Sequence, residues 1–325
     1  MSASYIGLDV GGTKIAAARL SDGELVDHAL EPTDASDSQA LLEEMSTAIE
    51  RVRTDDVVAV GVGIPSVVEF ATGRAKTSVN VPFADLAIRD ELRKRIGLPV
   101  FVDNDATVAA LAEACEGEEI VVENLVMFTV GTGVGGGLVL GGRPYRGATG
   151  AAAEFGHTII GMRVEGGAPE GGKFPQEGSL ESVAAGTALD RLASEAVSEH
   201  PDSYLGRRKA AGDDRITGHD VVDGAKEGDE IAIGLLELLG ERLGIGIANA
   251  INTFDPDVVA IGGGVSSAGG LLLEPAARVA RDYVLPGVGE STDIRLSVHG
   301  TKAGVLGAAL LAKLESNQED QQEGK

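Results

Sequence analysis

The chain has 325 residues, of which 43% are hydrophobic and 3% aromatic, and its formal net charge at pH 7 is −24. This length is enough for two domains with cores of their own. The acidic balance argues against nucleic acids and anionic membranes as partners, because both bind through a basic surface. An apolar run of about 18 residues and a secretory signal are both absent from the sequence.

The N-terminal part alternates predicted strands and helices. Residues 5–11 and 14–21 predict two strands joined by a glycine-rich turn. The following pattern predicts a strand at 25–30, a helix at 38–53, a strand at 57–65, a helix at 83–97 that ends at Gly97, a strand at 99–105, and a helix that closes at Cys115.

After the polar stretch 116–124 the pattern begins again. Residues 125–145 predict strand, glycine-rich turn and strand, about 120 residues after the first such unit. The repeated hairpin indicates two similar domains. The remaining pattern predicts a helix at 180–199, a polar and mobile segment at 200–215, a helix at 229–252, a strand at 258–265, and helices at 271–284 and 302–314.

Cysteine content and charge indicate the cellular setting. Cys115 is the only cysteine, which excludes an internal disulfide and fits a reducing, cytoplasmic compartment. Its apolar helical context indicates a buried structural thiol. The acidity suits a halophilic source, because salt screening weakens self-repulsion. An ordinary acidic cytosolic enzyme is the alternative.

The glycine-rich turns are candidate phosphate sites. In DVGGTK (9–14), glycines let backbone N–H groups approach an anion, and Thr13 and Lys14 add donors. The pattern is neither a P-loop nor a Rossmann fingerprint. A Gly-Gly hairpin by itself is an ordinary tight turn, but Asp9 and the repeat GTGVGGG (131–137) favour phosphate binding. The candidate nucleotide residues are Gly11, Gly12, Thr13, Lys14, Gly131, Thr132, Gly133 and, for adenosine, Gly262, Gly263 and Gly264.

The motifs LDVGGTK, VDNDA, GTGVGGG, AAAEFGH, LESVAAGTAL and AIGGGV occur in this order. The series resembles the ROK family of sugar kinases and related repressors, over roughly residues 5–315. The resemblance implies an α/β, actin-like ATPase (ribonuclease H-like) fold with two α/β domains flanking a nucleotide and sugar cleft. It also implies ATP and Mg²⁺ as cofactors, a hexose substrate and a homodimer. The expected reaction is the conversion of glucose to glucose 6-phosphate.

Several alternatives stay open beside glucose phosphorylation. Kinases for N-acetylmannosamine, N-acetylglucosamine, fructose or allose, and a non-catalytic sugar sensor, share the resemblance. A DNA-binding repressor is disfavoured by the acidity and the early start of the kinase-like pattern, and an actin-like assembly protein has no need for sugar-site residues. We expect a smaller domain over 1–117 plus 303–316, a larger domain over 118–302, and a disordered tail over 317–325.

A phosphoryl transfer to an alcohol requires a base for the hydroxyl proton. Asp105 lies at the end of the predicted strand 99–105, where α/β proteins build their sites. From the residues alone, Asp105 is equally well interpreted as a cap of the helix that follows. The resemblance makes Asp105 the catalytic base and Asn104 a sugar ligand.

The resemblance implies further site residues. Each of these residues also has an interpretation without a ligand. Glu154 and His157 could be ordinary surface residues, Glu181 an acid at a helix N-terminus, and Asp9 a carboxylate that is hydrogen-bonded to the backbone. The implied sugar ligands besides Asn104 and Asp105 are Asn80, Glu154, His157 and Glu181, and Asp9 is expected to hold Mg²⁺ through water.

Two departures from the family pattern stand out. Many family members bind a structural zinc ion through a histidine and three cysteines, but the cysteine positions here hold Gly172, Phe174 and Ser179. A site that lacks three of its four ligands does not hold zinc, so we predict no zinc and expect His157 to serve the sugar alone. In addition, Ser66 replaces a family glycine near the sugar, which could narrow the sugar pocket.

Overall fold

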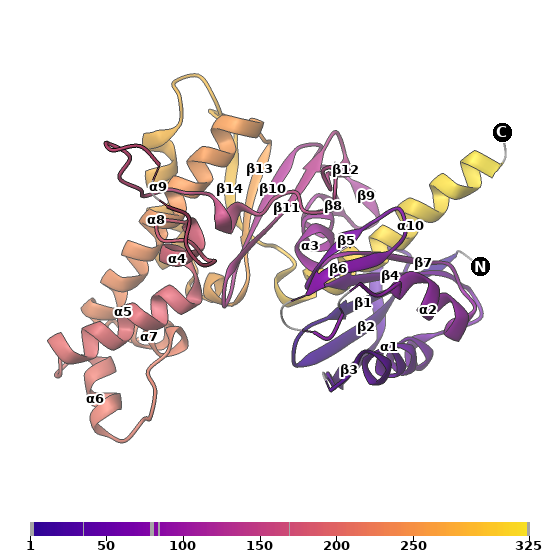
Figure 1. The fold of residues 1–325 in the computed structure, drawn as a ribbon, viewed down its shortest axis with the longest axis horizontal. Helices are drawn as coiled ribbons and strands as arrows, with labels where there is room; N and C mark the ends of the chain where they lie inside the picture. Colours follow the sequence, from indigo (N-terminus) through magenta and orange to yellow (C-terminus); the bar gives the residue numbers. More distant parts are fainter. Residues whose placement is uncertain (1–2, 35, 79–80, 84, 169, 324–325) are drawn as a thin grey trace. The chain divides into compact units, whose positions relative to one another are not determined.

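The computed structural model describes residues 3–323 except 35, 79–80, 84 and 169 (Figure 1). The chain divides into two compact units. Unit 1 comprises residues 1–125, 137–153 and 298–325, and unit 2 comprises residues 126–136 and 154–297. Among the described residues, no helix combines the length and the apolar character needed to span a membrane.

Unit 1 is built on a five-stranded sheet with the order β3-β2-β1-β4-β7. β1 pairs antiparallel with β2 and parallel with β4, which in turn pairs parallel with β7. Asp9 lies opposite Gly63, and Asn104 lies opposite Ile64, so the carboxyl ends of three parallel strands meet at one edge. The strands are β1 (Ser4–Val10), β2 (Lys14–Ser21), β3 (Glu24–Pro32), β4 (Val57–Ile64) and β7 (Val100–Asn104).

Alternation along these strands separates two faces of the sheet. Leu8 and Val62 belong to the core beneath α1 and α2, whereas Gly7 and Gly61 point to the other face. A Cβ atom on either glycine would overlap backbone atoms of α10, which therefore packs directly on β1 and β4. Figure 1 shows α10 on the opposite side of the sheet from α1. The helices are α1 (Ser38–Val52), α2 (Ile88–Ile96), α3 (Asp105–Glu113) and α10 (Ala303–Glu323).

Shorter strands complete this part of the chain. β5 (Ser66–Glu69) and β6 (Arg74–Ser78) form one antiparallel hairpin, and β8 (Cys115–Glu116) and β9 (Glu119–Ile120) form another. Cys115 is 7% exposed, and burial raises the pKa of its thiol to about 11.

The second five-stranded sheet has the order β12-β11-β10-β13-β14. Its strands are β10 (Leu125–Val130), β11 (Val134–Leu140), β12 (Arg143–Pro144), β13 (Val258–Gly262) and β14 (Asp293–Leu296). In the core of unit 2, Phe155 packs against Phe128 and Phe254, with ring centroids 5.0 and 6.1 Å away. The helices of unit 2 are α4 (Leu180–Ala184), α5 (Gly186–Glu199), α6 (Tyr204–Ala210), α7 (Gly218–Lys226), α8 (Glu230–Phe254) and α9 (Gly270–Tyr283), with short 3-10 turns η1 (Phe155–His157) and η2 (Gly264–Ala268).

Two predicted helices have different bounds. The helix predicted over 83–97 begins only at Ile88, because Asp85 adopts a left-handed backbone with φ of 52°. The helix predicted over 180–199 is two helices, α4 and α5, separated by the extended residue Ala185. Ahead of α2, Leu86 also forms a β-bridge with Ala75, so the residues between Asp85 and Ile88 depart from the helical pattern as well.

Three further segments are more helical than predicted. The polar segment 200–215 contains α6, which Ser203 caps and the buried Leu205 anchors. α7 was not predicted, although Thr217 and Asp220 form a capping box at its start. α10 continues to Glu323 through the predicted disordered tail, because glutamine and glutamate favour helices.

Candidate active site

Two carboxylates lie at the sheet edge of unit 1. Asp9 is on β1, and Asp105 is the first residue of α3, directly after β7. Burial raises the pKa of Asp9 to about 6, although Lys14 opposes the shift. Burial and the charge of Asp9 together raise the pKa of Asp105 to about 6. Two neighbouring carboxylic acids with raised pKa values are typical of a functional site.

Asn104 caps α3. Its Oδ1 accepts hydrogen bonds from the backbone N of Ala106 (2.9 Å) and of Thr107 (3.1 Å), while its Nδ2 donates to the carbonyl oxygen of Ser66 (3.4 Å). The capping role considered for Asp105 therefore falls mainly to Asn104, although Asp105 Oδ1 also accepts from the Ala106 N (2.8 Å). The amide that the sequence assigns to the sugar thus also fixes the start of the helix that carries Asp105.

The first glycine turn is held through its carbonyl groups. Thr33, at the end of β3, donates from Oγ1 to the Gly11 carbonyl (2.8 Å) and from its N to the Thr13 carbonyl (3.1 Å). Gly11 N donates to the Lys14 carbonyl (2.9 Å). Because C=O and N–H point in opposite directions across a trans peptide, fixing the Gly11 carbonyl also fixes the direction of the Gly12 N–H.

The second glycine turn is held in the same way in unit 2. The backbone N of Gly186, the first residue of α5, donates to the Gly131 carbonyl (2.7 Å), and Thr187 Oγ1 donates to the Thr132 carbonyl (3.1 Å). A Cβ atom on Gly186 would lie 2.6 Å from the Gly131 oxygen, so only glycine allows this approach. The break between α4 and α5 therefore places a helix N-terminus against the turn.

Glu181 lies against the same turn. Its Oε2 accepts a hydrogen bond from the backbone N of Val134 (2.8 Å). A Cβ atom on Gly133 would overlap this carboxylate. The structure thus gives Glu181 a contact with the glycine turn, in addition to the sugar contact that the sequence predicts.

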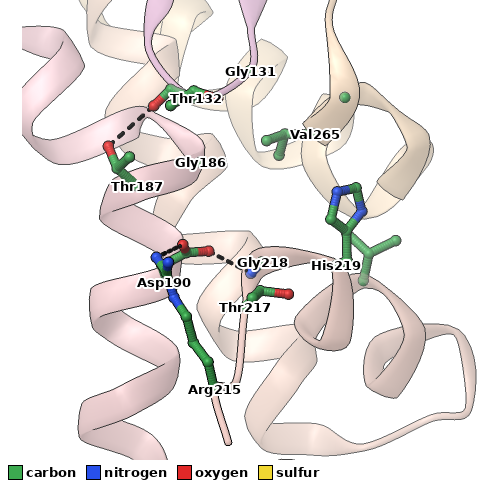
Figure 2. A pocket seen from close by; sticks show the side chains of 12 residues that line it. Gly131, Thr132, Gly186, Thr187, Asp190, Arg215, Thr217, Gly218, His219 and Val265 are labelled. Atoms are coloured by element: carbon green, nitrogen blue, oxygen red, sulfur yellow. Dashed lines mark hydrogen bonds and ion pairs between the residues drawn. The ribbon is translucent and has the colours of Figure 1, made fainter. Parts of the chain in front are cut away.

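A cavity of about 370 Å³ in unit 2 adjoins this turn (Figure 2). Asp190 supports one wall, since it accepts from the Gly218 N (2.7 Å) and pairs with Arg215 (2.6 Å). Gly264 borders the cavity, whereas an added Cβ on Gly263 would overlap backbone atoms of Val130. The cavity is lined by Gly131, Thr132, Gly186, Thr187, Asp190, Arg215, Thr217, Gly218, His219, Val222, Gly264 and Val265.

The structure therefore brings together two of the glycine runs that the sequence singles out. Thr132 from the second turn and Gly264 from the third run border the same cavity. Gly262 and Gly263 do not line it: Gly262 packs on Met127, and Gly263 adopts φ of 88° beside β10. A concave site with two glycine-rich edges and both polar and apolar lining residues can accommodate a nucleoside.

Glu154 and His157 form a second polar group in unit 2. Glu154 directly precedes η1 and His157 is its last residue, and His157 Nε2 lies 3.9 Å from Glu154 Oε2. Both side chains are exposed, by 52% for Glu154 and 37% for His157, while Phe155 between them is buried. The buried phenylalanine fixes η1, so the two polar side chains remain available to a ligand.

The ROK family model matches residues 5–315. The chain belongs to the ROK family. It is 38% identical to a glucokinase of Halalkalibacterium halodurans, over 96% of each chain. The structure resembles a ROK family glucokinase from Streptomyces griseus in complex with glucose and AMPPNP, with a TM-score of 0.80, 31% identity, and coverage of 96% of this chain and 99% of that one. A ROK hexokinase from Thermus thermophilus matches with a TM-score of 0.75, 34% identity, and coverage of 97% and 99%.

These findings confirm the family and the fold class that the sequence predicts. The resemblance inferred from six ordered motifs covers the matched range, and the actin-like α/β fold agrees with the solved ROK structures.

The family's zinc-binding positions carry other side chains in this ROK protein. Ser179 is fully buried and caps α4 through a hydrogen bond from Ser182 N (3.3 Å). Phe174 packs edge-on against His157, with ring centroids 5.4 Å apart. Backbone hydrogen bonds from Ile160 and Gly161 to the Gly178 carbonyl (2.8 and 3.1 Å) close the base of the segment. Backbone pairing therefore joins the two ends of the segment that begins at residue 161 and ends at residue 178.

The predicted site residues are divided between the units. Asp9, the first glycine turn, Asn104 and Asp105 belong to unit 1, and Glu154, His157, Glu181 and the other two glycine runs belong to unit 2. Asn80 lies outside the described residues. Within the described part of the chain, His, Cys, Asp and Glu side chains form no group of three or more that could hold a metal ion.

Proposed function

We propose that this ROK protein is an ATP-dependent glucokinase, which transfers the γ-phosphoryl group of ATP to a hydroxyl of glucose and yields glucose 6-phosphate. The observation that carries the proposal is the likeness, over nearly the full length of both chains, to glucokinases and to a glucose- and AMPPNP-bound ROK structure. The carboxylate pair of unit 1 supplies the base that such a reaction requires.

Asp105 is the proposed catalytic base. It accepts the hydroxyl proton as the sugar oxygen attacks the γ-phosphorus in line. A pKa of about 6 in the free protein keeps Asp105 mostly ionised at neutral pH, yet basic enough to take up a proton. The proposed sugar ligands are Asn80, Asn104, Asp105, Glu154, His157 and Glu181.

The proposed nucleotide ligands are residues of the unit 2 cavity and the backbone of the glycine-rich turns. The cavity beside Thr132 and Gly264 accommodates the nucleoside, and backbone N–H groups of the turns at 11–14 and 131–133 bind phosphate oxygens. When bound together with ATP, Mg²⁺ would supply neutralisation of the phosphate charge. The carboxylate of Asp9 is a hard oxygen donor that suits Mg²⁺, through water, and its raised pKa reflects a buried charge without full compensation.

The proposed setting is the cytoplasm of a cell with high internal salt, at the start of glycolysis. The net charge of −24 and the single cysteine support this setting. We also propose a homodimer without nucleic-acid or membrane partners. The sequence-based domain bounds of 1–117 plus 303–316 and 118–302 stay a prediction, and unit 1 of the structure also takes in residues 137–153.

An ADP-release assay with ATP and Mg²⁺, at low and at molar KCl, tests the function over a panel of hexoses and N-acetylhexosamines. Strong turnover with glucose is the expected result. Turnover only with another sugar would keep the mechanism and change the substrate. Absence of turnover with every sugar, from protein shown to be folded, would refute the kinase proposal and favour a sugar-sensing role.

A further inference from the structure

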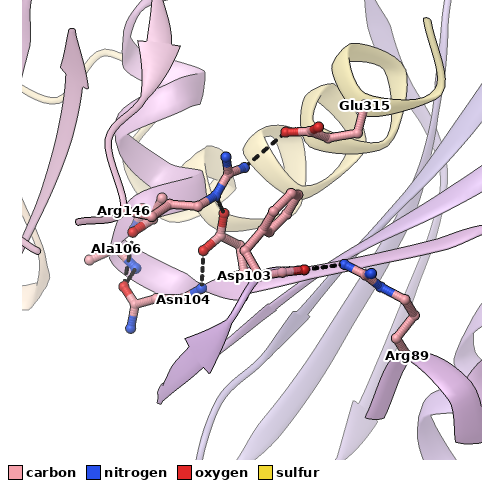
Figure 3. Close-up of polar contacts among 8 residues, drawn as sticks. Arg89, Asp103, Asn104, Ala106, Arg146 and Glu315 are labelled. Carbon is pink, nitrogen blue, oxygen red and sulfur yellow. Dashed lines mark hydrogen bonds and ion pairs between the residues drawn. The ribbon is translucent and has the colours of Figure 1, made fainter. Parts of the chain in front are cut away.

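A buried charged cluster in unit 1 lies directly before the proposed base (Figure 3). Asp103, on β7, is 1% exposed, and its Oδ2 accepts a hydrogen bond from Arg146 Nε (2.6 Å). The other carboxylate oxygen, Oδ1, accepts from the backbone N of Asn104 (2.9 Å). One carboxylate therefore connects the guanidinium of Arg146 to the backbone of the residue that precedes Asp105.

Arg146 is itself held on two further sides. Its Nη2 donates to Glu315 Oε1 on α10 (3.0 Å), and its guanidinium carbon lies 3.5 Å from the ring centroid of Phe70. Arg89 in turn donates hydrogen bonds to the carbonyl oxygens of Phe70 and Ala71. A planar guanidinium that stacks on a ring and donates in two directions has little freedom, so it can act as a rigid support.

The segment that carries Arg146 packs against a second support of Asn104. Gly150 adopts φ of 85°, and a Cβ atom there would overlap the Val68 carbonyl oxygen on β5. β5 begins at Ser66, whose carbonyl accepts from Asn104 Nδ2 (3.4 Å). Both the backbone and the side chain of Asn104 therefore contact groups that lie next to the Arg146 segment.

We propose that Arg146 is a positioning residue for phosphoryl transfer, which acts through Asp103 to fix Asn104 and thereby the direction of the Asp105 carboxylate. The proposal rests on the proposed role of Asp105 as the base. Without the guanidinium, the buried Asp103 carboxylate lacks its cationic partner, and its rearrangement releases the Asn104 backbone. Glu315 contacts Arg146 but not Asp103, so it serves as the matched control.

The test measures kcat, and KM for glucose and for ATP, in Arg146→Gln, Arg146→Lys, Asp103→Asn, Glu315→Gln and the double variant Arg146→Gln/Asp103→Asn. We expect Arg146→Gln and Asp103→Asn to lower kcat about tenfold or more, because small displacements of reacting groups are costly. KM for ATP should change less than about twofold. Arg146→Lys should recover part of the loss, Glu315→Gln should stay within about twofold of the parent, and the double variant should lose no more than the worse single variant.

A second readout does not require activity. Hydrogen exchange of a peptide spanning residues 100–107 should accelerate in Arg146→Gln but not in Glu315→Gln, while a peptide from α1 stays unchanged. Unchanged exchange and an unchanged kcat in Arg146→Gln, whatever its melting temperature, would overturn the proposal. An equal loss of kcat in Glu315→Gln would also overturn it, since glutamine keeps an oxygen acceptor for Arg146 Nη2 and leaves the hydrogen bond from Arg146 to Asp103 in place.

Two further outcomes are also decisive. If Arg146→Gln fails to fold, kcat and hydrogen exchange of Arg146→Lys and Asp103→Asn test the proposal in its place. An inactive parent protein would refute the proposed function. The hydrogen exchange of the peptide spanning residues 100–107 would then still show whether Arg146 holds Asn104 in place.

Discussion

Replacement of Asp105 by asparagine tests both its proposed role as the catalytic base and the effect of its raised pKa on protein stability. Asparagine keeps the size of the side chain and its acceptor for the Ala106 N–H, but it cannot take up the proton of a sugar hydroxyl. Loss of a general base costs about 10²–10⁴-fold in rate. We therefore expect kcat of Asp105→Asn to fall by that factor, while the Kd for glucose changes much less.

The same substitution should stabilise the protein at neutral pH. The folded pKa of Asp105 is raised from 3.8 to about 6, so the folded state favours the protonated acid. This contribution to stability is fully present below the unfolded pKa and is lost as the pH rises through about 6. At pH 8 the ionised carboxylate then costs at most about 3 kcal/mol. Asparagine does not ionise, so the variant avoids this cost.

Unfolding experiments at pH 4 to 8, without nucleotide or Mg²⁺, measure this difference. The stability gain of Asp105→Asn over the parent should grow with pH by about 1–3 kcal/mol and level off above pH 7. Asp85→Asn is the matched control, because its side chain is 81% exposed, and it should leave both kcat and the pH dependence unchanged. A gain that is independent of pH, or a kcat near that of the parent, would refute the assignment of Asp105.

Three further expectations concern the site and the surface. Gly304→Ala should lower kcat with little loss of stability, because an added Cβ would lie 2.6 Å from Asp9 Cγ and displace the carboxylate; an unchanged kcat would contradict this. Glu181→Ala should raise the KM for ATP severalfold by releasing Val134 N, whereas a change in the glucose KM alone would indicate a sugar contact only. The melting temperature should rise between 0.1 and 2 M KCl, since salt shortens the range of repulsion at a net charge of −24; a fall would exclude salt adaptation.

Hydrophobic patterns predicted most strands and helices of this protein, because surface helices bury one apolar face and the central strands are continuous apolar runs buried on both faces. It could not show where the helix over 180–199 breaks. Ala185 is an ordinary helix former, and its extended backbone follows from the contact of Gly186 with Gly131, which lies far away in sequence. Asp85 likewise has a left-handed backbone that the sequence pattern did not predict, and α2 begins only after it, at Ile88.

The sequence identified the strand end that carries the proposed base, but not the side chains that hold it in place. Asn104 and Asp105 lie at the end of a recognisable strand, and a family motif contains them. Arg146 and Glu315 carry no local signal, since Arg146 contacts Asp103 across 43 residues of sequence and Glu315 contacts Arg146 across 169. Glu181 was recognised from its motif, yet its hydrogen bond to Val134 N was not, because that bond joins two motifs across the fold.

The proposed phosphate-binding role of the two glycine turns depends on the groups that bind their carbonyl oxygens. Glycine alone allows many backbone conformations, so a glycine-rich turn without support would lose its preorganisation for an anion. Thr33 fixes the Gly11 carbonyl in unit 1, and the N-terminus of α5 fixes the Gly131 carbonyl in unit 2. Because each carbonyl opposes the next N–H in the chain, both supports orient a donor away from themselves. The two turns therefore share more than their glycine-rich sequence, because in each a bound carbonyl fixes the direction of the next backbone N–H. The group that binds the carbonyl differs: it is Thr33 after β3 in unit 1 and the N-terminus of α5 in unit 2.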